Sequence, residues 1–203
     1  MVLLSVSMYA QDTNTFLGDG DMGGAAASPT ANTNNTGFGT DALELLTTGS
    51  DNTAVGFQAL ENNVTGLFNT AVGSHALQMN TGNNNSAFGS YALQMNTSGR
   101  FNTAIGNLTL SVNTTGIGNT AIGHTALQMN TTGIDNTAVG TIALRNNTTG
   151  EGNTGIGRRA LENNAGGLFN TAVGADALNA NTCLLYTSPS PRDATLSRMP
   201  SSA

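Results

Sequence analysis

Polar and apolar residues recur along this chain with a period of 17 residues. The recurring segment reads Asn-Thr-Ala-(Val/Ile)-Gly or a close variant, and an earlier copy, Asn14-Thr-Phe-Leu-Gly18, precedes the regular series. A unit of this length is too short for a helix pair or for a strand followed by a helix, but it suits one solenoid coil of two short strands and two turns. We therefore predict an all-β fold, a parallel β-solenoid (β-roll) of about ten coils. The regular copies begin at Asn35, Asn52, Asn69, Asn85, Asn102, Asn119, Asn136, Asn153 and Asn170, and only the step from Asn69 to Asn85 is one residue shorter.

Certain positions of the repeat hold the same kind of residue in every coil. With the first Asn as position 1, position 5 is always Gly, position 9 is always Leu, and position 4 is Val, Ile or Phe. Because positions 4 and 9 carry the only large apolar residues present in every coil, we expect both to point inward. Gly at position 5 and near position 15 allows turn conformations closed to other residues. Asn at positions 1 and 12, stacked on itself in each coil, predicts an amide ladder.

These positions together define a predicted structural ladder along the rod. It is represented by Asn52, Gly56, Leu60, Asn69, Gly73, Leu77, Asn102, Gly106, Leu110, Asn119, Gly123, Leu127, Asn136, Gly140 and Leu144.

The two ends of the chain depart from the repeat. Residues 1–10 resemble the back half of a truncated secretory signal peptide, although an ordinary buried strand is the alternative. Residues 11–34 predict an irregular N-terminal coil and loop, and residues 35–182 predict solenoid repeats truncated at their C-terminus. Residues 183–203 resemble a translated sequencing adapter, so we expect this segment to be non-native; a disordered Ser/Pro-rich tail is the alternative.

Composition narrows the range of functions. Residues 1–182 contain four Arg, no Lys and eleven acidic residues, a net charge of −7. This argues against nucleic-acid binding, which needs clustered Lys and Arg to neutralise phosphates, and against a basic membrane-surface helix. The same residues contain no Cys, which argues against disulfides and Cys-based metal sites, and no apolar run is long enough to span a membrane.

Few residues suggest catalytic or metal chemistry. His75 and His124 occupy different repeat positions, so we interpret both as surface residues rather than as a metal pair. Gly18-Asp-Gly-Asp21 favours a structural turn over a calcium site, because the calcium β-roll signature occurs in tandem. Met residues at position 11 favour packing over a binding surface. We predict no enzyme activity, no cofactor and no bound metal. The Met residues are Met79, Met95 and Met129. The N-glycosylation pattern Asn-x-Ser/Thr begins at Asn63, Asn96, Asn113, Asn130 and Asn147.

The segment from Asn52 to Leu60, Asn-Thr-Ala-Val-Gly-Phe-Gln-Ala-Leu, and its copies resemble the head repeats of trimeric autotransporter adhesins. The resemblance covers about residues 35–182, although the repeats of that family are usually shorter. It implies a β-roll in which three chains pack side by side as a homotrimer, a secreted or cell-surface location, and a host-surface or matrix ligand. The Asn-Thr-Thr-Gly turns are also similar to bacterial tail-fibre-like proteins, which often end in an intramolecular chaperone domain.

Three non-enzymatic functions follow as hypotheses. The first is a surface adhesin or fibre shaft, and the second is a phage-like tail fibre whose lost C-terminus carried a chaperone domain. The third is an ice-binding solenoid, because Thr recurs at position 2 in every regular copy except Ser86. An ice-binding face usually needs two adjacent columns of such residues, whereas we expect the column beside the Thr residues to be Asn or Ala. Because so narrow a core is marginally stable alone, we also expect the Ala columns at positions 3 and 8 to pack between chains.

Overall fold

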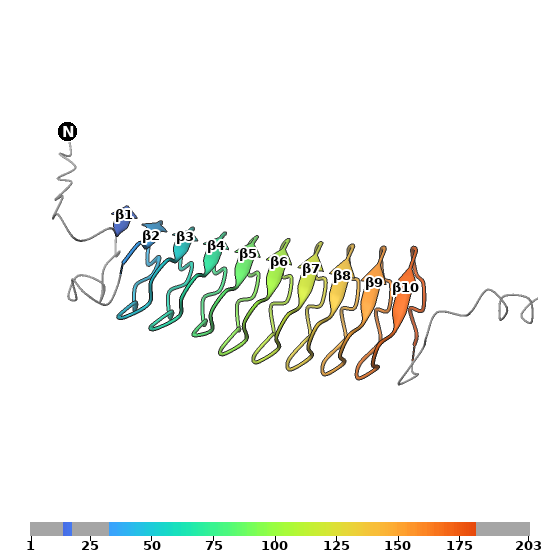
Figure 1. Cartoon of the computed structure of the whole chain (residues 1–203). Coiled ribbons are helices and arrows are strands. Elements are labelled where there is room, and N and C mark those ends of the chain that lie inside the picture. Colours follow the sequence, from blue (N-terminus) through green and yellow to red (C-terminus); the bar gives the residue numbers. More distant parts are fainter. Residues whose placement is uncertain (1–13, 18–32, 182–203) are drawn as a thin grey trace, which may run out of the picture.

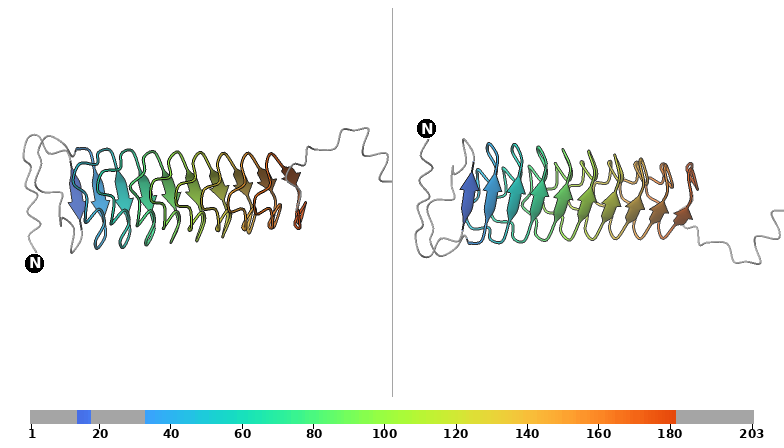
Figure 2. Two further views of the ribbon diagram at one scale, coloured as in Figure 1. Left: turned by 90° about the horizontal axis from the view of Figure 1, so that it is seen from below. Right: turned by 90° about the horizontal axis from the view of Figure 1, so that it is seen from above.

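The computed structural model describes residues 14–17 and 33–181. Ten three-residue parallel strands lie side by side in chain order and form one sheet along a rod (Figures 1 and 2). This arrangement confirms the predicted parallel β-solenoid. The strands are β1 (Thr15–Leu17), β2 (Thr36–Phe38), β3 (Thr53–Val55), β4 (Thr70–Val72), β5 (Ser86–Phe88), β6 (Thr103–Ile105), β7 (Thr120–Ile122), β8 (Thr137–Val139), β9 (Thr154–Ile156) and β10 (Thr171–Val173).

Each strand pairs with the next one at the same repeat position. Thr53 lies opposite Thr70, and Thr70 lies opposite Ser86 although that repeat is one residue shorter. The missing residue therefore falls in a turn, and the sheet register is unaffected. Among the described residues each coil contains one strand, so the expectation of two strands per coil is wrong. Residues Gly56–Asn62 show the reason, because this part of the coil is a succession of turns in which Gln58 and Leu60 have φ of 55° and 52°.

The interior of the rod is filled by small residues, Leu and Asn. Position 9 points inward as predicted; Leu127, for example, is fully buried. Position 4 does not point inward, and that expectation is wrong. Ala121 at position 3 is fully buried while Ile122 at position 4 is 38% exposed, because successive residues of a strand face opposite sides of a sheet. The Ala columns at positions 3 and 8 lie in the core, so the expectation that they pack between chains is also wrong.

Two buried asparagine ladders run along the interior. At position 1, Asn119 donates from its main-chain N and from Nδ2 to Oδ1 of Asn102, at 3.0 and 3.2 Å, and Nδ2 also donates to the Gly133 carbonyl at 2.8 Å. At position 12, Asn130 Nδ2 donates to Asn113 Oδ1 at 2.7 Å. Each amide thus joins its own turn to the neighbouring coil, so the ladders replace part of the hydrophobic contact that so narrow a core cannot provide.

Glycine has two different structural roles in the coil. Gly123 at position 5 has φ of 128°, and a Cβ there would lie 2.7 Å from the main chain of Gly140 in the next coil. Position 15 was expected to need an unusual turn conformation, but Gly133 has an ordinary φ. A Cβ on Gly133 would instead collide with Asn130 Oδ1 and lie 2.6 Å from the Gly150 carbonyl. Position 15 is therefore Gly because of space rather than backbone conformation.

Several sequence predictions lie outside the described residues. These are the signal peptide at residues 1–10, the calcium-like turn from Gly18 to Asp21, most of the predicted N-terminal loop, and the adapter-like segment at residues 183–203. Within the described part of the chain, no helix is long and apolar enough to cross a membrane.

Candidate interaction surface of the solenoid

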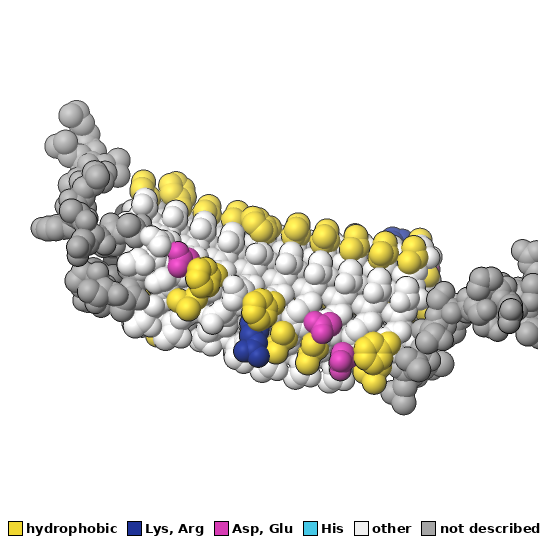
Figure 3. Space-filling view, viewed as in Figure 1, with side chains coloured by type: hydrophobic (Ala, Val, Ile, Leu, Met, Phe, Trp, Pro, Cys, Tyr) yellow, Lys and Arg dark blue, Asp and Glu magenta, His cyan; other side chains and the backbone are white. Residues whose placement is uncertain are grey.

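The outer face of the sheet carries two parallel columns of side chains. Position 2 supplies Thr or Ser, and position 4 supplies Val, Ile, Leu or Phe, because both flank the inward-facing position 3. The position-4 column is apolar from β1 to β10, and Figure 3 shows a row of yellow side chains along the upper edge of the rod, where the strands lie. Its exposed members range from 38% for Ile122 to 69% for Val173. They are Leu17, Phe38, Phe88, Ile105, Ile122, Ile156 and Val173.

Positions 16 and 17, beside this face, carry a mixture of apolar, charged and small polar residues or glycine that changes from coil to coil. Phe68, Phe101 and Phe169 are each more than half exposed. Asp51 and Asp135 occupy equivalent positions in other coils, and Figure 3 shows the interspersed yellow, magenta and blue side chains below the white band. The position-2 and position-4 columns contain no charge, whereas their border does. An uncharged centre with a charged border is the composition expected of a contact surface.

The methionines at position 11 lie on the surface. Met79, Met95 and Met129 are 46%, 48% and 39% exposed, so the predicted packing role does not place them in the buried core. Position 11 follows the buried Leu at position 9 and an outward position 10, and the chain turns inward again only at the Asn of position 12.

The two histidines have different surroundings. His75 stacks on Tyr91 with 4.8 Å between ring centroids and meets Phe57 edge-on at 5.2 Å. Its Nδ1 lies 2.8 Å from the hydroxyl of Ser74. His124 is exposed. The structure does not bring the two together, and no group of three or more His, Cys, Asp or Glu side chains suited to a metal ion occurs within residues 14–17 and 33–181.

The N-glycosylation patterns start at buried residues. Asn63, Asn96, Asn113, Asn130 and Asn147 are all position-12 asparagines with no exposed surface. Their Nδ2 atoms, to which a sugar would be attached, donate hydrogen bonds within the ladder, as Asn130 does to Asn113 and Gly133. A glycan on the folded rod would break these bonds, so the patterns reflect the turn sequence rather than a row of sugars.

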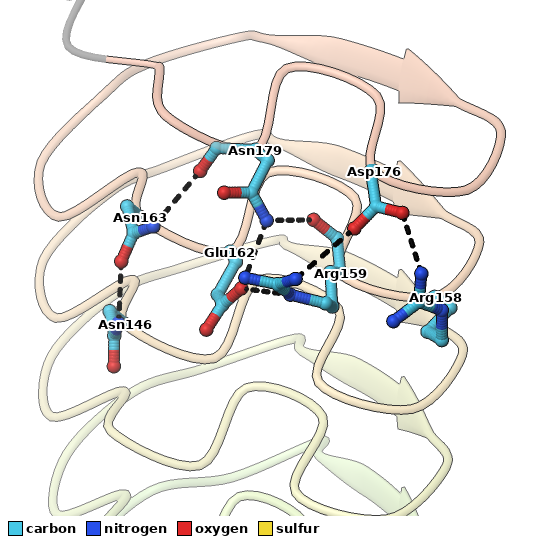
Figure 4. Close-up of polar contacts among 7 residues, drawn as sticks. All are labelled: Asn146, Arg158, Arg159, Glu162, Asn163, Asp176 and Asn179. Carbon is cyan, nitrogen blue, oxygen red and sulfur yellow. Dashed lines mark hydrogen bonds and ion pairs between the residues drawn. The ribbon is translucent and has the colours of Figure 1, made fainter.

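The ion pairs of the described residues lie in the last two coils (Figure 4). Arg159 Nε contacts Glu162 Oε2 at 2.7 Å, and Arg158 pairs with Asp176 at 2.7 Å. Asn179 of the last coil donates to Glu162 Oε2 at 2.9 Å. The hydrogen bond with Glu162 raises the pKa of Arg159, and the hydrogen bond from Arg159 lowers the pKa of Glu162 despite partial burial. This cluster links the final coil to the one before it.

The structure places the asparagines and leucines of the predicted ladder inside the rod, where they are fully buried. The glycines of that ladder are half-buried and have φ between 128° and 136°. The interaction surface is formed by other residues, at positions 2 and 4. Comparisons with protein-family models, curated proteins and solved structures found no match to this chain.

Proposed function

We propose that this chain is a non-enzymatic fibre shaft of a secreted or cell-surface adhesin, in which copies pack side by side as a homotrimer through the outer faces of their sheets. The observation that carries the proposal is the unbroken apolar column at position 4. An exposed apolar surface running the length of a soluble rod favours an interaction site. The same shaft would serve a tail fibre, and a host-surface or matrix ligand would bind to the assembled fibre.

The size of the column suits a contact between whole rods. Full burial of a Val, Ile or Phe side chain is worth about 1.5–3 kcal/mol, and many position-4 side chains are already partly covered. Burying the remainder would contribute about 1 kcal/mol per coil, or about 10 kcal/mol over ten strands. This is comparable to the association cost of about 4–15 kcal/mol. A long rod can therefore associate through this face where one or two coils could not.

The test measures the mass of the full chain in solution. We expect multi-angle light scattering to give a trimer for the unsubstituted chain and a monomer for Ile105→Lys combined with Ile122→Lys, with β-rich circular dichroism in both. The matched control places lysines at exposed position 14, as Thr115→Lys with Thr132→Lys, and should remain trimeric. A natural chain that is folded and monomeric would refute lateral packing.

An ice-binding surface is a second candidate, favoured by the pairing of positions 2 and 4. The expectation that the Thr column lies beside Asn or Ala is wrong, because those side chains are buried. The Thr column lies beside an aliphatic column from β6 to β10 without interruption. The two columns form a lattice spaced about 4.8 Å along the rod and about 7 Å across each strand. Thermal hysteresis that Ile122→Lys abolishes would support this function, and its absence from the natural chain would exclude it.

A further inference from the structure

Each coil has two corners beside the outer face of the sheet, one on either side of the strand. Positions 16 and 17 lie just before the strand and form the leading corner, and positions 6 and 7 lie just after it and form the trailing corner. Figure 3 shows the leading corner below the white band, and Figure 4 shows Arg158 and Arg159 of the trailing corner beyond β9. In the described coils every residue of both corners except Thr125 is at least partly exposed. Both corners are therefore accessible to a neighbouring copy.

The two corners carry large side chains on a backbone that large side chains rarely adopt. Phe68 and Phe101 of the leading corner have φ of 58° and 59°, and Ile142 of the trailing corner has φ of 66°. This left-handed region suits Gly and Asn, whereas a bulky or β-branched residue there is an outlier. Gly118 and Gly152 occupy position 17 in other coils, so the fold itself does not require the aromatic rings. Exposed aromatic side chains on a strained backbone point to a contact made outside the chain.

Residues of the two corners also match in height along the rod. One coil of 17 residues rises about 4.8 Å, so two residues that are seven apart in the chain differ in height by only about 2 Å. Three pairs have this separation, with the leading-corner residue named first: Phe68 with His75, Phe101 with Leu108, and Glu151 with Arg158. The members of each pair would face each other if the leading corner of one copy met the trailing corner of an aligned second copy.

Two of these pairs are apolar or aromatic. Phe68 is 56% exposed, and the His75 ring that it would meet already belongs to the ring cluster described above. Phe101 is 58% exposed, and Leu108 is partly exposed. Contact within these pairs would remove apolar surface from water at two heights of the rod, and the ring pair would add a favourable aromatic geometry.

The third pair is ionic. Glu151 is exposed, and its carboxylate forms no ion pair within the described coils. Arg158 is also exposed, and it uses one guanidinium nitrogen, Nη2, in its ion pair with Asp176. An arginine has five N–H donors, so this side chain can hold a second carboxylate. Opposite charges at matched height favour one alignment of two rods over others.

We propose that neighbouring copies in the lateral assembly are parallel and aligned coil to coil, with the leading corner of each copy against the trailing corner of the next. A rotation axis along the rods brings these unlike corners together at every contact, so three copies close a ring. An antiparallel pair would instead bring like corners together. This inference rests on the proposed fibre function and identifies the residues that set the direction and alignment of its contacts.

The test joins the two corners chemically in the full chain, with Cys183→Ser as the background. Glu151→Cys combined with Arg158→Cys is treated with a short bismaleimide, and we expect covalent dimers and trimers on a denaturing gel. Each substitution alone should give only monomer. The matched control combines Glu151→Cys with Ser74→Cys, which also occupies position 6 but differs in height by about 22 Å, and it should give only monomer. Loss of one exposed ion pair should leave the assembly intact.

Light scattering of the same samples separates this inference from the proposed function. Covalent dimers from either single variant would show like corners in contact, and a trimer of the double variant that forms no crosslink would show that the unlike corners do not meet. Either result would overturn the inference and leave lateral packing standing. Equal crosslinking of the control with Ser74→Cys would overturn the coil-to-coil alignment. A folded monomer would refute the fibre proposal and this inference with it.

Discussion

The position-1 ladder leads to a prediction in which the same substitution has different costs at two places. Asn119 lies in the middle of the ladder, where Nδ2 donates to Asn102 and Gly133 and Oδ1 accepts two groups of Asn136. Asn170 lies at the end, where Nδ2 donates to Asn153 and Asn164 but Oδ1 accepts nothing among the described residues. Alanine at either position removes the amide and changes nothing else in the chain.

The cost follows from the groups that each substitution leaves unpaired. Asn119→Ala leaves the main-chain N–H of Asn136 and one of its Nδ2 hydrogens without their acceptor, whereas the Gly133 carbonyl keeps Asn130 Nδ2 as a donor. At about 1–3 kcal/mol for each of the two buried groups, the loss is about 2–6 kcal/mol. Asn170→Ala orphans no group, because Asn153 Oδ1 keeps the main-chain N–H of Asn170. It should cost only two net hydrogen bonds, about 1–3 kcal/mol.

Urea unfolding followed by circular dichroism measures the difference. Both variants are compared with the natural chain and with Thr115→Ala, an exposed-site control that should change stability by less than about 0.5 kcal/mol. Because end fraying can hide a local loss in a repeat protein, amide hydrogen exchange of the central coils accompanies the unfolding curve. Equal costs for Asn119→Ala and Asn170→Ala would show that completed amide ladders do not stabilise the rod.

Two further predictions concern backbone conformation and pH. Gly123→Ala should destabilise the rod by about 1–3 kcal/mol through backbone strain alone, and contact of the new Cβ with Gly140 should add to this cost. Gly118→Asn should be tolerated, because position 17 holds non-glycine residues at a similar φ in other coils. Thermal unfolding of the two variants checks this, and equal losses would contradict it. Arg159 lowers the pKa of Glu162 in the folded chain. The contribution of this pair to stability is therefore fully present above the pKa that Glu162 has in the unfolded chain, and it is lost as the pH falls through the lower pKa of Glu162 in the folded chain. Glu162→Gln should flatten the acid limb of a stability–pH curve, and an unchanged curve would argue against the linkage.

The sequence predicts the fold well because the repeat leaves few alternatives. Seventeen residues cannot hold a helix pair, and the invariant Gly and Asn require a stacked turn structure. The single shorter step between Asn69 and Asn85 is accommodated in a turn, so the sheet register could be read directly from the spacing. The number of strands per coil could not, because Leu60 and its equivalents take a left-handed backbone that a large apolar residue rarely adopts.

The direction of the position-4 side chains was predicted wrongly for a physical reason. Large apolar residues usually lie inside, but in this coil the interior is narrow and already holds Ala at positions 3 and 8, Leu at position 9 and two Asn. Strand alternation gave the correct signal, because an inward Ala54 requires Val55 to face outward. The near-constant small residue at position 3 was therefore a better indicator of the core than the larger one beside it. The same point applies to the N-glycosylation patterns, whose asparagines belong to the core.

The narrow interior also explains the chemistry of the proposed lateral contact. The coil has too little internal volume for its β-branched residues, so these form the outer face, and a lateral contact between rods would be mainly hydrophobic. Substituting Ile122 should therefore weaken this contact without removing a hydrogen bond of the amide ladders. Salt that strengthens apolar burial should favour lateral association of the rods.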